Sequence, residues 1–362
     1  MRAVTDRARF SGCVGLRRQV YAAPARPSDK KGVPRGGPSC YLRAMAETGR
    51  AGFVAIVGLP NVGKSTLLNL LLGQKIAIVA PKPQTTRNRI LGVKNLPGAQ
   101  LVLVDTPGIH RPAGRARTAL NRFMMDEALG AVADVDAIAL VVEVPESSEQ
   151  ARIRAGGYRL PKSARFILDT LREANKPTVL VINKVDLLRD KGLLLPVLEA
   201  WSAAFNFRAL VPISALRGEG EKRLTQELVA LLPEGDRLFP EEMITDRAER
   251  WLAAEMVREQ VFLLTRQEVP YAVAVTIDEF EERPARGERP ADVMLSATVH
   301  VEKEAQKRIV VGEGGRMVKE IGTRARAEIE GMLDCPVHLR LFVRVDADWT
   351  QKPGGLRDMG YE

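Results

Sequence analysis

The residues whose types and spacing best support chemistry lie in one short run, GLPNVGKST, at positions 58–66. Gly58, Gly63, Lys64 and Ser65 have the spacing of a phosphate-binding loop. In such a loop, glycines let backbone N–H groups close around the α- and β-phosphates, a lysine reaches the β- and γ-phosphates, and a serine hydroxyl binds Mg²⁺. We therefore predict a nucleotide site formed by Gly58, Leu59, Pro60, Asn61, Val62, Gly63, Lys64, Ser65 and Thr66.

The neighbouring residues supply the elements that such a loop needs. Residues 53–57 (FVAIV) have the length and branching of a buried strand, and residues 65–72 (STLLNLLL) have the run of a helix packed on a sheet. That helix would present its positive end to the phosphates. A glycine-rich turn without a ligand could match the same pattern, but the strand before it and the helix after it favour the phosphate loop.

Two further segments carry candidate Mg²⁺ ligands. Residues 81–89 (PKPQTTRNR) read as a loop, on which Thr85 or Thr86, and we favour Thr86, would bind Mg²⁺ and sense the γ-phosphate. A threonine pair in a basic loop is more often solvated surface. A predicted strand at 101–104 ends in Asp105, Thr106, Pro107 and Gly108. Asp105 would hold Mg²⁺ through water and the Gly108 N–H would bond the γ-phosphate, although such a sequence also forms ordinary turns.

Base recognition is predicted at the ends of two later strands. Residues 178–182 lead into Asn183, Lys184, Val185 and Asp186, and residues 209–213 lead into Ser214 and Ala215. The Asp186 carboxylate can accept from the N1–H and amino group of guanine, which adenine cannot match. The Ala215 N–H could meet guanine O6, while Asn183 and Lys184 would brace the pocket.

Taken together with a further strand at 136–142, these motifs predict an α/β fold. We expect a parallel sheet with helices on both faces and ligand loops at the carboxyl ends of the strands. Residues 145–161 read as a surface loop. We divide the chain into a disordered basic extension (1–49), a nucleotide-binding domain (50–232), a linker (233–245) and a second domain with a tail (246–362).

The net charge of +9 comes almost entirely from the start of the chain, because residues 1–44 hold 10 Lys and Arg against 2 Asp and Glu. Bulk charge therefore says nothing about a nucleic-acid partner. The extension could be a transit peptide or an RNA-contacting arm, but we favour a translation start at Met45.

Three scattered cysteines fit a reducing compartment, and we find no apolar run of about 18 residues that could cross a membrane.

The second domain shows the pattern of an RNA-binding fold. A helix capped by Thr245 is followed by strands at 271–277 and 291–301, a helix at 303–309, a helix reaching Met332 and a strand at 337–345. This α-β-β-α-α-β order, with Gly-x-x-Gly between the last two helices, predicts a smaller α+β domain, a KH domain of type II.

Local charge supports RNA binding by this domain. Its loop would clamp a single-stranded backbone while flanking helices offer basic side chains. The candidate RNA-binding residues are Lys303, Lys307, Arg308, Gly312, Glu313, Gly314, Gly315, Arg316 and Lys319. A flexible turn and a solvated helix face are the plainer explanations of the same residues.

The whole set of motifs resembles the Era family of GTPases over residues 50–362. The most specific pieces are residues 81–89 (PKPQTTRNR), 105–110 (DTPGIH), 253–258 (AAEMVR), 268–275 (EVPYAVAV) and the tail 348–361. The single phosphate loop and the order of the motifs exclude relatives with two GTPase domains or a circular permutation.

That resemblance implies a P-loop GTPase domain followed by a KH domain, with hydrolysis of GTP to GDP and phosphate. Lys64, Thr86 and Gly108 would be catalytic, and Ser65, Thr86 and Asp105 would manage Mg²⁺. The KH domain would grip the 3′ end of the 16S rRNA, so that nucleotide state switches an event in small (30S) ribosomal subunit biogenesis. The family also implies a cytoplasmic monomer, with peripheral contact at the inner face of the membrane.

Three residues bear on how this chain would behave. Ile109 stands where many GTPases have a water-orienting glutamine, and Ile cannot hydrogen-bond water, so we expect slow intrinsic turnover. Asn61 resembles the position at which related enzymes coordinate K⁺. Glu313 departs from a usually basic position and should weaken RNA binding.

Two alternatives come from other classes. One is an RNA-binding scaffold with a vestigial GTPase domain, which the intact nucleotide motifs oppose. The other is a tRNA-modifying GTPase, which would need a catalytic cysteine in the tail. Cys335 lies before a strand, and no cysteine follows it.

Overall fold

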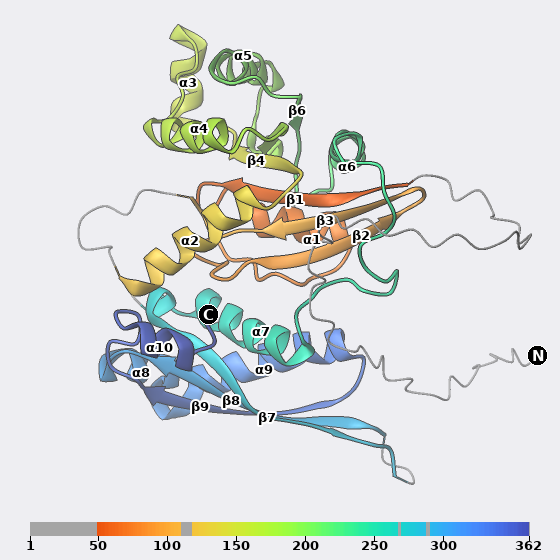
Figure 1. Ribbon diagram of the computed structural model, residues 1–362. Helices are drawn as coiled ribbons and strands as arrows, with labels where there is room; N and C mark the ends of the chain where they lie inside the picture. The colour runs from red at the N-terminus through yellow and green to blue at the C-terminus, as the bar shows by residue number, and fades with distance from the viewer. Residues whose placement is uncertain (1–48, 110–117, 267–268, 287–289, 362) are drawn as a thin grey trace, which may run out of the picture.

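The computed structural model describes residues 49–109, 118–266, 269–286 and 290–361. The predicted basic extension lies outside these ranges up to residue 48, as does His110. Two sheets organise the described chain, and helix α7 (Glu249–Leu264) runs between them (Figure 1). Leu252 of α7 is buried in the core of the first sheet, and Val257 is buried in that of the second.

The first sheet has six strands in the order β2-β3-β1-β4-β5-β6. Its strands are β1 (Arg50–Gly58), β2 (Ile90–Leu96), β3 (Ala99–Asp105), β4 (Ala137–Glu143), β5 (Thr178–Asn183) and β6 (Ala209–Pro212). All pair in parallel except β2, which is antiparallel to β3. The mainly parallel sheet confirms the predicted α/β class.

Helices cover both faces of this sheet, because its central strands are apolar on both sides. The helices are α1 (Lys64–Leu72), α2 (Ala119–Ala133), α3 (Ser147–Gly156), α4 (Lys162–Ala174), α5 (Leu194–Ala204) and α6 (Glu221–Ala230). Val54 and Ile56 of β1 share a core with α1 and α6, whereas Ala55 and Val57 share the opposite core with α2, α4 and α5. The phosphate loop thus connects two rigid, buried elements.

Two parts of this domain depart from the prediction. The expected surface loop at 145–161 is wrong, because α3 forms within it. The side chain of Ile153 is buried in the same core as α2 and α4, and the Gly157 N–H closes the helix end on the Ile153 carbonyl. Strand β2 was also missed. It is an edge strand whose own sequence does not alternate regularly between apolar and polar residues. Its antiparallel pairing with β3 stabilises the extended backbone.

The second sheet has the order β7-β8-β9, with β7 (Ala274–Arg283) antiparallel to β8 (Asp292–Val301) and β8 parallel to β9 (Val337–Val345). Helices α8 (Glu304–Val311) and α9 (Arg316–Leu333) lie between β8 and β9 in the chain. Residues of α7, α8 and α9 form one core with the sheet. The order α7-β7-β8-α8-α9-β9 confirms the predicted α-β-β-α-α-β topology.

The start of α7 differs from the prediction. Thr245 is not its cap. Ala248 occupies the N-cap position, and the Thr245 Oγ1 accepts from the Arg247 N–H at 3.3 Å. The chain at this point is extended against β2, since the Val93 N–H donates to the Ile244 carbonyl at 2.7 Å. That pairing delays the helix until Glu249.

The C-terminal tail returns to the first domain. It contains α10 (Pro353–Asp358), which the sequence did not indicate and which lies beside α2. Trp349, Leu356 and Tyr361 of the tail form a cluster with Leu120 and Met124 of α2. Within the described ranges, no helix is both long enough and apolar enough to cross a membrane.

Candidate nucleotide and RNA sites

The phosphate loop has a backbone that only certain residues can adopt. Gly58 has φ 154° and Gly63 has φ 95°, both in the region that favours glycine. A Cβ at Gly63 would lie 2.2 Å from Asn183 Nδ2, and one at Gly58 would lie 2.2 Å from the Val141 carbonyl oxygen. The Lys64 ammonium folds back over the loop and donates to the Leu59 carbonyl at 3.0 Å. The loop is therefore preformed for a ligand.

Three side-chain oxygens gather at the start of α1. Ser65 Oγ and Thr86 Oγ1 each lie 2.8 Å from Asp105 Oδ2 and 2.8 Å from one another. All three residues are buried, and Asp105 Oδ1 is a buried oxygen with no hydrogen-bond partner among the described residues. Hydroxyl and carboxylate oxygens are the ligands that Mg²⁺ prefers. The geometry brings together the three predicted ligands, with Thr86 rather than Thr85 facing Asp105.

Burial perturbs both charges beside this cluster. Loss of water lowers the pKa of Lys64 to about 8, although the Asp105 carboxylate opposes the shift. Burial raises the pKa of Asp105, while Lys64 and the Ser65 and Thr86 hydroxyls oppose that shift. Burial thus makes the charged form of each group less favourable, and an incoming ligand of opposite charge would offset this desolvation. Phosphate oxygens would do so for Lys64, and a divalent cation would do so for Asp105.

The predicted base-recognition residues come together at the ends of β5 and β6. Ser214 Oγ donates to Asp186 Oδ1 at 2.6 Å, and Asn183 Nδ2 donates to the Val62 carbonyl at 2.8 Å. Lys184 forms an ion pair with Glu143. The prediction for Ala215 differs from the structure. Its N–H donates to Asn183 Oδ1 at 2.9 Å, so this amide braces the pocket instead of facing the base.

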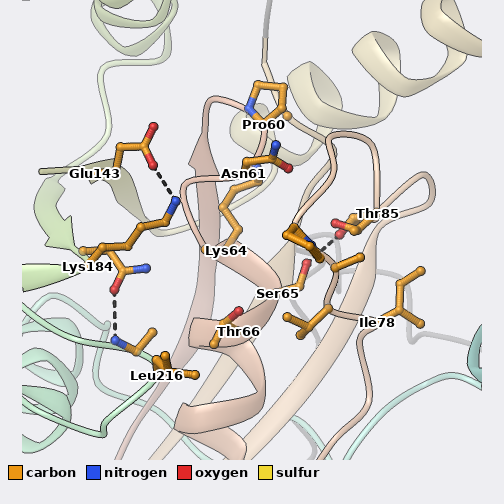
Figure 2. A pocket seen from close by; sticks show the side chains of 18 of the residues that line it. Pro60, Asn61, Lys64, Ser65, Thr66, Ile78, Thr85, Glu143, Lys184 and Leu216 are labelled. Carbon is orange, nitrogen blue, oxygen red and sulfur yellow. Dashed lines mark hydrogen bonds and ion pairs between the residues drawn. The ribbon is translucent and has the colours of Figure 1, made fainter. Parts of the chain in front are cut away.

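These loops surround a cavity of about 600 Å³, a volume typical of ligand sites. Figure 2 shows side chains of the phosphate loop, Thr85, Lys184 and Leu216 around it. Among the predicted nucleotide residues, those that line the cavity are Pro60, Asn61, Gly63, Lys64, Ser65, Thr66, Thr86, Gly108, Asn183, Lys184, Asp186 and Ala215.

The remaining predicted residues, Gly58, Leu59, Val62, Asp105, Thr106, Pro107, Ile109 and Ser214, support the cavity from behind. Thr106 Oγ1 donates to the Ile56 carbonyl at 2.8 Å, and the Ile109 N–H donates to the Gly58 carbonyl at 3.0 Å. Sequence reasoning missed several lining residues, among them Ile78, Glu143 and Leu216. Glu143 closes β4, so its position at the carboxyl end of a parallel strand was the available signal.

The candidate RNA residues lie on one loop and the two helices that flank it. Gly312, Gly314 and Gly315 have φ values of 70°, 60° and 78°, which explains three glycines in four residues. Lys303, Arg308, Arg316 and Lys319 are exposed, and Lys307 is half-buried. Glu313 Oε2 pairs with Arg316 Nη2 at 2.8 Å, with 89% and 79% of the two side chains exposed.

Comparison with protein families supports the assignment of both domains. Residues 53–184 match the family of 50S ribosome-binding GTPases, and residues 268–350 match the KH domain. The fold and the site thus define a P-loop GTPase joined to a KH domain.

Relatives resolve the class further. GTPase Era of Geotalea uraniireducens (strain Rf4) is 46% identical over 318 residues, which is 86% of this chain and 98% of that protein. GTPase Era of Syntrophus aciditrophicus (strain SB) is 47% identical over 312 residues, covering 86% and 95%. The chain belongs to the Era family of GTPases.

Solved structures of Era proteins support the same family assignment. A crystal structure of Era with MgGDPNP and nucleotides 1506–1542 of 16S ribosomal RNA matches with a TM-score of 0.78 and 40% identity, covering 86% of this chain and 99% of that one. A single-residue variant of Aquifex aeolicus Era bound to GDP·AlF4⁻ matches equally well, with a TM-score of 0.78 and 40% identity over the same shares of the two chains. Mg²⁺ is the cofactor that these comparisons support.

Proposed function

We propose that this GTPase binds the 3′ end of the 16S rRNA through its KH domain and acts as a nucleotide-controlled switch in 30S subunit biogenesis. The observation that carries the proposal is the likeness over 86% of the chain to an Era structure that holds MgGDPNP and nucleotides 1506–1542 of 16S rRNA. The Era family assignment favours this function over a scaffold or a tRNA-modifying enzyme.

The nucleotide residues take the following parts. Ser65, Thr86 and Asp105 would hold Mg²⁺, which would supply positive charge to offset that of the phosphates. Lys64 and the loop amides stabilise charge that develops on the phosphate oxygens, and the Gly108 N–H bonds the γ-phosphate. Asp186 selects guanine, held in place by Ser214.

The RNA residues act at the loop between α8 and α9. Lys303, Lys307, Arg308, Arg316 and Lys319 bind phosphates, and the backbone of Gly312–Gly315 approaches the strand closely. The test is the affinity of the full chain for a single-stranded RNA that copies the 16S rRNA 3′ end, with a non-hydrolysable GTP analogue and then with GDP. We expect tighter binding with the analogue. Equal or absent binding in both states would leave a GTPase whose partner is another molecule.

The finer properties of the site are also proposals. Asn61 has φ 65° and lines the cavity, which supports a role for it as a K⁺ ligand. We expect faster GTP hydrolysis in KCl than in NaCl, and equal rates would contradict this role.

The protein is a cytoplasmic monomer with peripheral contact at the inner membrane. Light scattering and co-sedimentation with anionic vesicles test these two properties.

A further inference from the structure

The residue after Thr86 is an arginine whose side chain lies inside the protein. Arg87 is 2% exposed, although its own segment belongs to the GTPase domain. Its guanidinium Nη1 donates to the Val273 carbonyl at 2.7 Å and to the Tyr361 hydroxyl at 3.0 Å. Its Nη2 donates to the carbonyls of Pro270 and Tyr271, both at 3.2 Å. All four acceptors come from the KH domain and the tail.

Aromatic rings complete the enclosure of this arginine. The guanidinium carbon lies 5.7 Å from the centroids of Trp349 and Tyr361 and 6.0 Å from that of Phe262. Trp349 and Tyr361 stack on one another, with ring centroids 5.8 Å apart and planes 11° apart. A desolvated guanidinium gains from ring faces and planar hydrogen bonding what it loses in hydration. The tail therefore covers Arg87 and fixes its position.

The residue before Thr86 is held by the same domain. Arg258 of α7 donates to the Thr85 carbonyl and pairs with Glu255. Farther out, Lys82 bonds to the carbonyls of Phe262 and Thr265. In many GTPases, Mg²⁺ and the γ-phosphate alone order this loop. Here both neighbours of Thr86 are anchored to the KH half of the chain.

We propose that Arg87 and Tyr361 are positioning residues for GTP hydrolysis, which place the Thr86 hydroxyl beside Ser65 and Asp105. The KH domain and tail thereby complete the GTPase site. This inference rests on the proposed GTP site and adds a control on it. Because coupling between sites is reciprocal, a ligand of the KH domain or tail that favours this contact raises affinity for the triphosphate by the same factor.

The test uses the full chain with Tyr361→Phe, which removes one hydroxyl and keeps the contacts of the ring with Arg87, Trp349 and Phe123. Tyr158→Phe is the matched control, since it removes a half-buried hydroxyl of the GTPase domain outside residues 81–89, the switch loop. A hydrogen bond to a charged donor contributes enough that we expect kcat for GTP to fall about tenfold. The affinity for a GTP analogue should fall with it. GDP affinity should stay within about twofold, because GDP does not engage Thr86 through a γ-phosphate.

A second variant protects the test against a folding defect. Arg87→Lys keeps the charge but cannot reach the four acceptors in one plane, so it should reproduce the selective loss. Unchanged kcat in both variants would overturn the inference, because the contact would then have no influence on hydrolysis. A parallel loss of GDP affinity in both would also overturn it, because the contact would then have only a general structural role. Failure of the unmodified chain to hydrolyse GTP would instead contradict the proposed nucleotide chemistry.

Discussion

The Ser214 hydroxyl donates to Asp186 Oδ1 at 2.6 Å and so joins the loops that follow β5 and β6. Asp186 lines the cavity, whereas Ser214 is fully buried behind it. One carboxylate oxygen is therefore held before any base arrives. Preorganisation of this kind makes base choice a property of Asp186 and not of loop motion.

Replacing Asp186 with Asn should change base preference. An amide presents a donor where guanine needs an acceptor, so GTP affinity should fall about 100-fold while affinity for XTP rises. Competition of GTP and XTP against a fluorescent nucleotide measures both. Asp190→Asn is the control, because that carboxylate accepts from the Gly192 N–H and does not line the cavity. Retained GTP affinity in Asp186→Asn would contradict the assignment.

The two threonines of the switch loop should behave differently. Thr86→Val removes a hydroxyl that lies 2.8 Å from both Ser65 Oγ and Asp105 Oδ2, so affinity for a GTP analogue with Mg²⁺ should fall about tenfold. Thr85→Val keeps the carbonyl that Arg258 uses and should have little effect. Titrations with Mg²⁺ or with EDTA compare the variants. An equal response of the two would rule out Thr86 as the metal ligand.

Nucleotide binding should be coupled to protonation of Lys64. With a pKa of about 8, this side chain is about half protonated at pH 8 in the free protein. Phosphate oxygens favour the charged form, so GDP binding without Mg²⁺ should take up about half a proton at pH 8, and affinity should fall as pH rises above that value.

Calorimetry in two buffers of different ionisation enthalpy measures this uptake. Lys64→Met should abolish the difference between the buffers, since no other group of the phosphate loop titrates in this range. Identical binding enthalpies for the unmodified protein in both buffers would contradict the shift.

Ile109 should tolerate a polar replacement poorly. It is 1% exposed and packs in the core that includes α2, so Ile109→Gln should lower the free energy of unfolding by about 2–3 kcal/mol. It should not raise kcat, because the side chain faces the core and not the cavity. Ile109→Val is the control, and we expect it to lower the free energy of unfolding by only about 1 kcal/mol. Thermal unfolding and turnover assays decide, and a faster, equally stable Gln variant would show that the side chain reaches water.

Glu313→Lys should bind RNA more tightly. The carboxylate now neutralises Arg316 at 2.8 Å on an exposed loop, and its replacement frees that cation and adds another. Filter binding should show an affinity about three- to tenfold higher, with a steeper dependence on salt. Glu282→Lys makes the same charge change on exposed β7, away from the loop. Equal gains in the two variants would mean that only net charge matters.

The elements that could be predicted share a physical property: their information is local. Residues 58–66 carry the backbone freedom, the cation and the hydroxyl of a phosphate loop in consecutive positions, and the apolar runs on either side show its strand and helix. The α-β-β-α-α-β order of the KH domain was readable for the same reason. Elements that were missed, among them β2, α3 and α10, depend on partners elsewhere: β3 for the first, a distant core for Ile153 in the second, and the cluster with α2 for the third.

The sequence by itself determined the two domain types, the chemistry of the nucleotide site and the family. Tertiary structure decided how the two halves meet. Three stretches that carried the family resemblance contact the fourth, at 81–89: Arg258, the segment 270–273 and Tyr361 supply the groups that hold Thr85 and Arg87. A buried cation needs acceptors and ring faces from several directions, and Tyr361 lies far from Arg87 in the chain. Only folding brings such groups together, so no local pattern could reveal this contact.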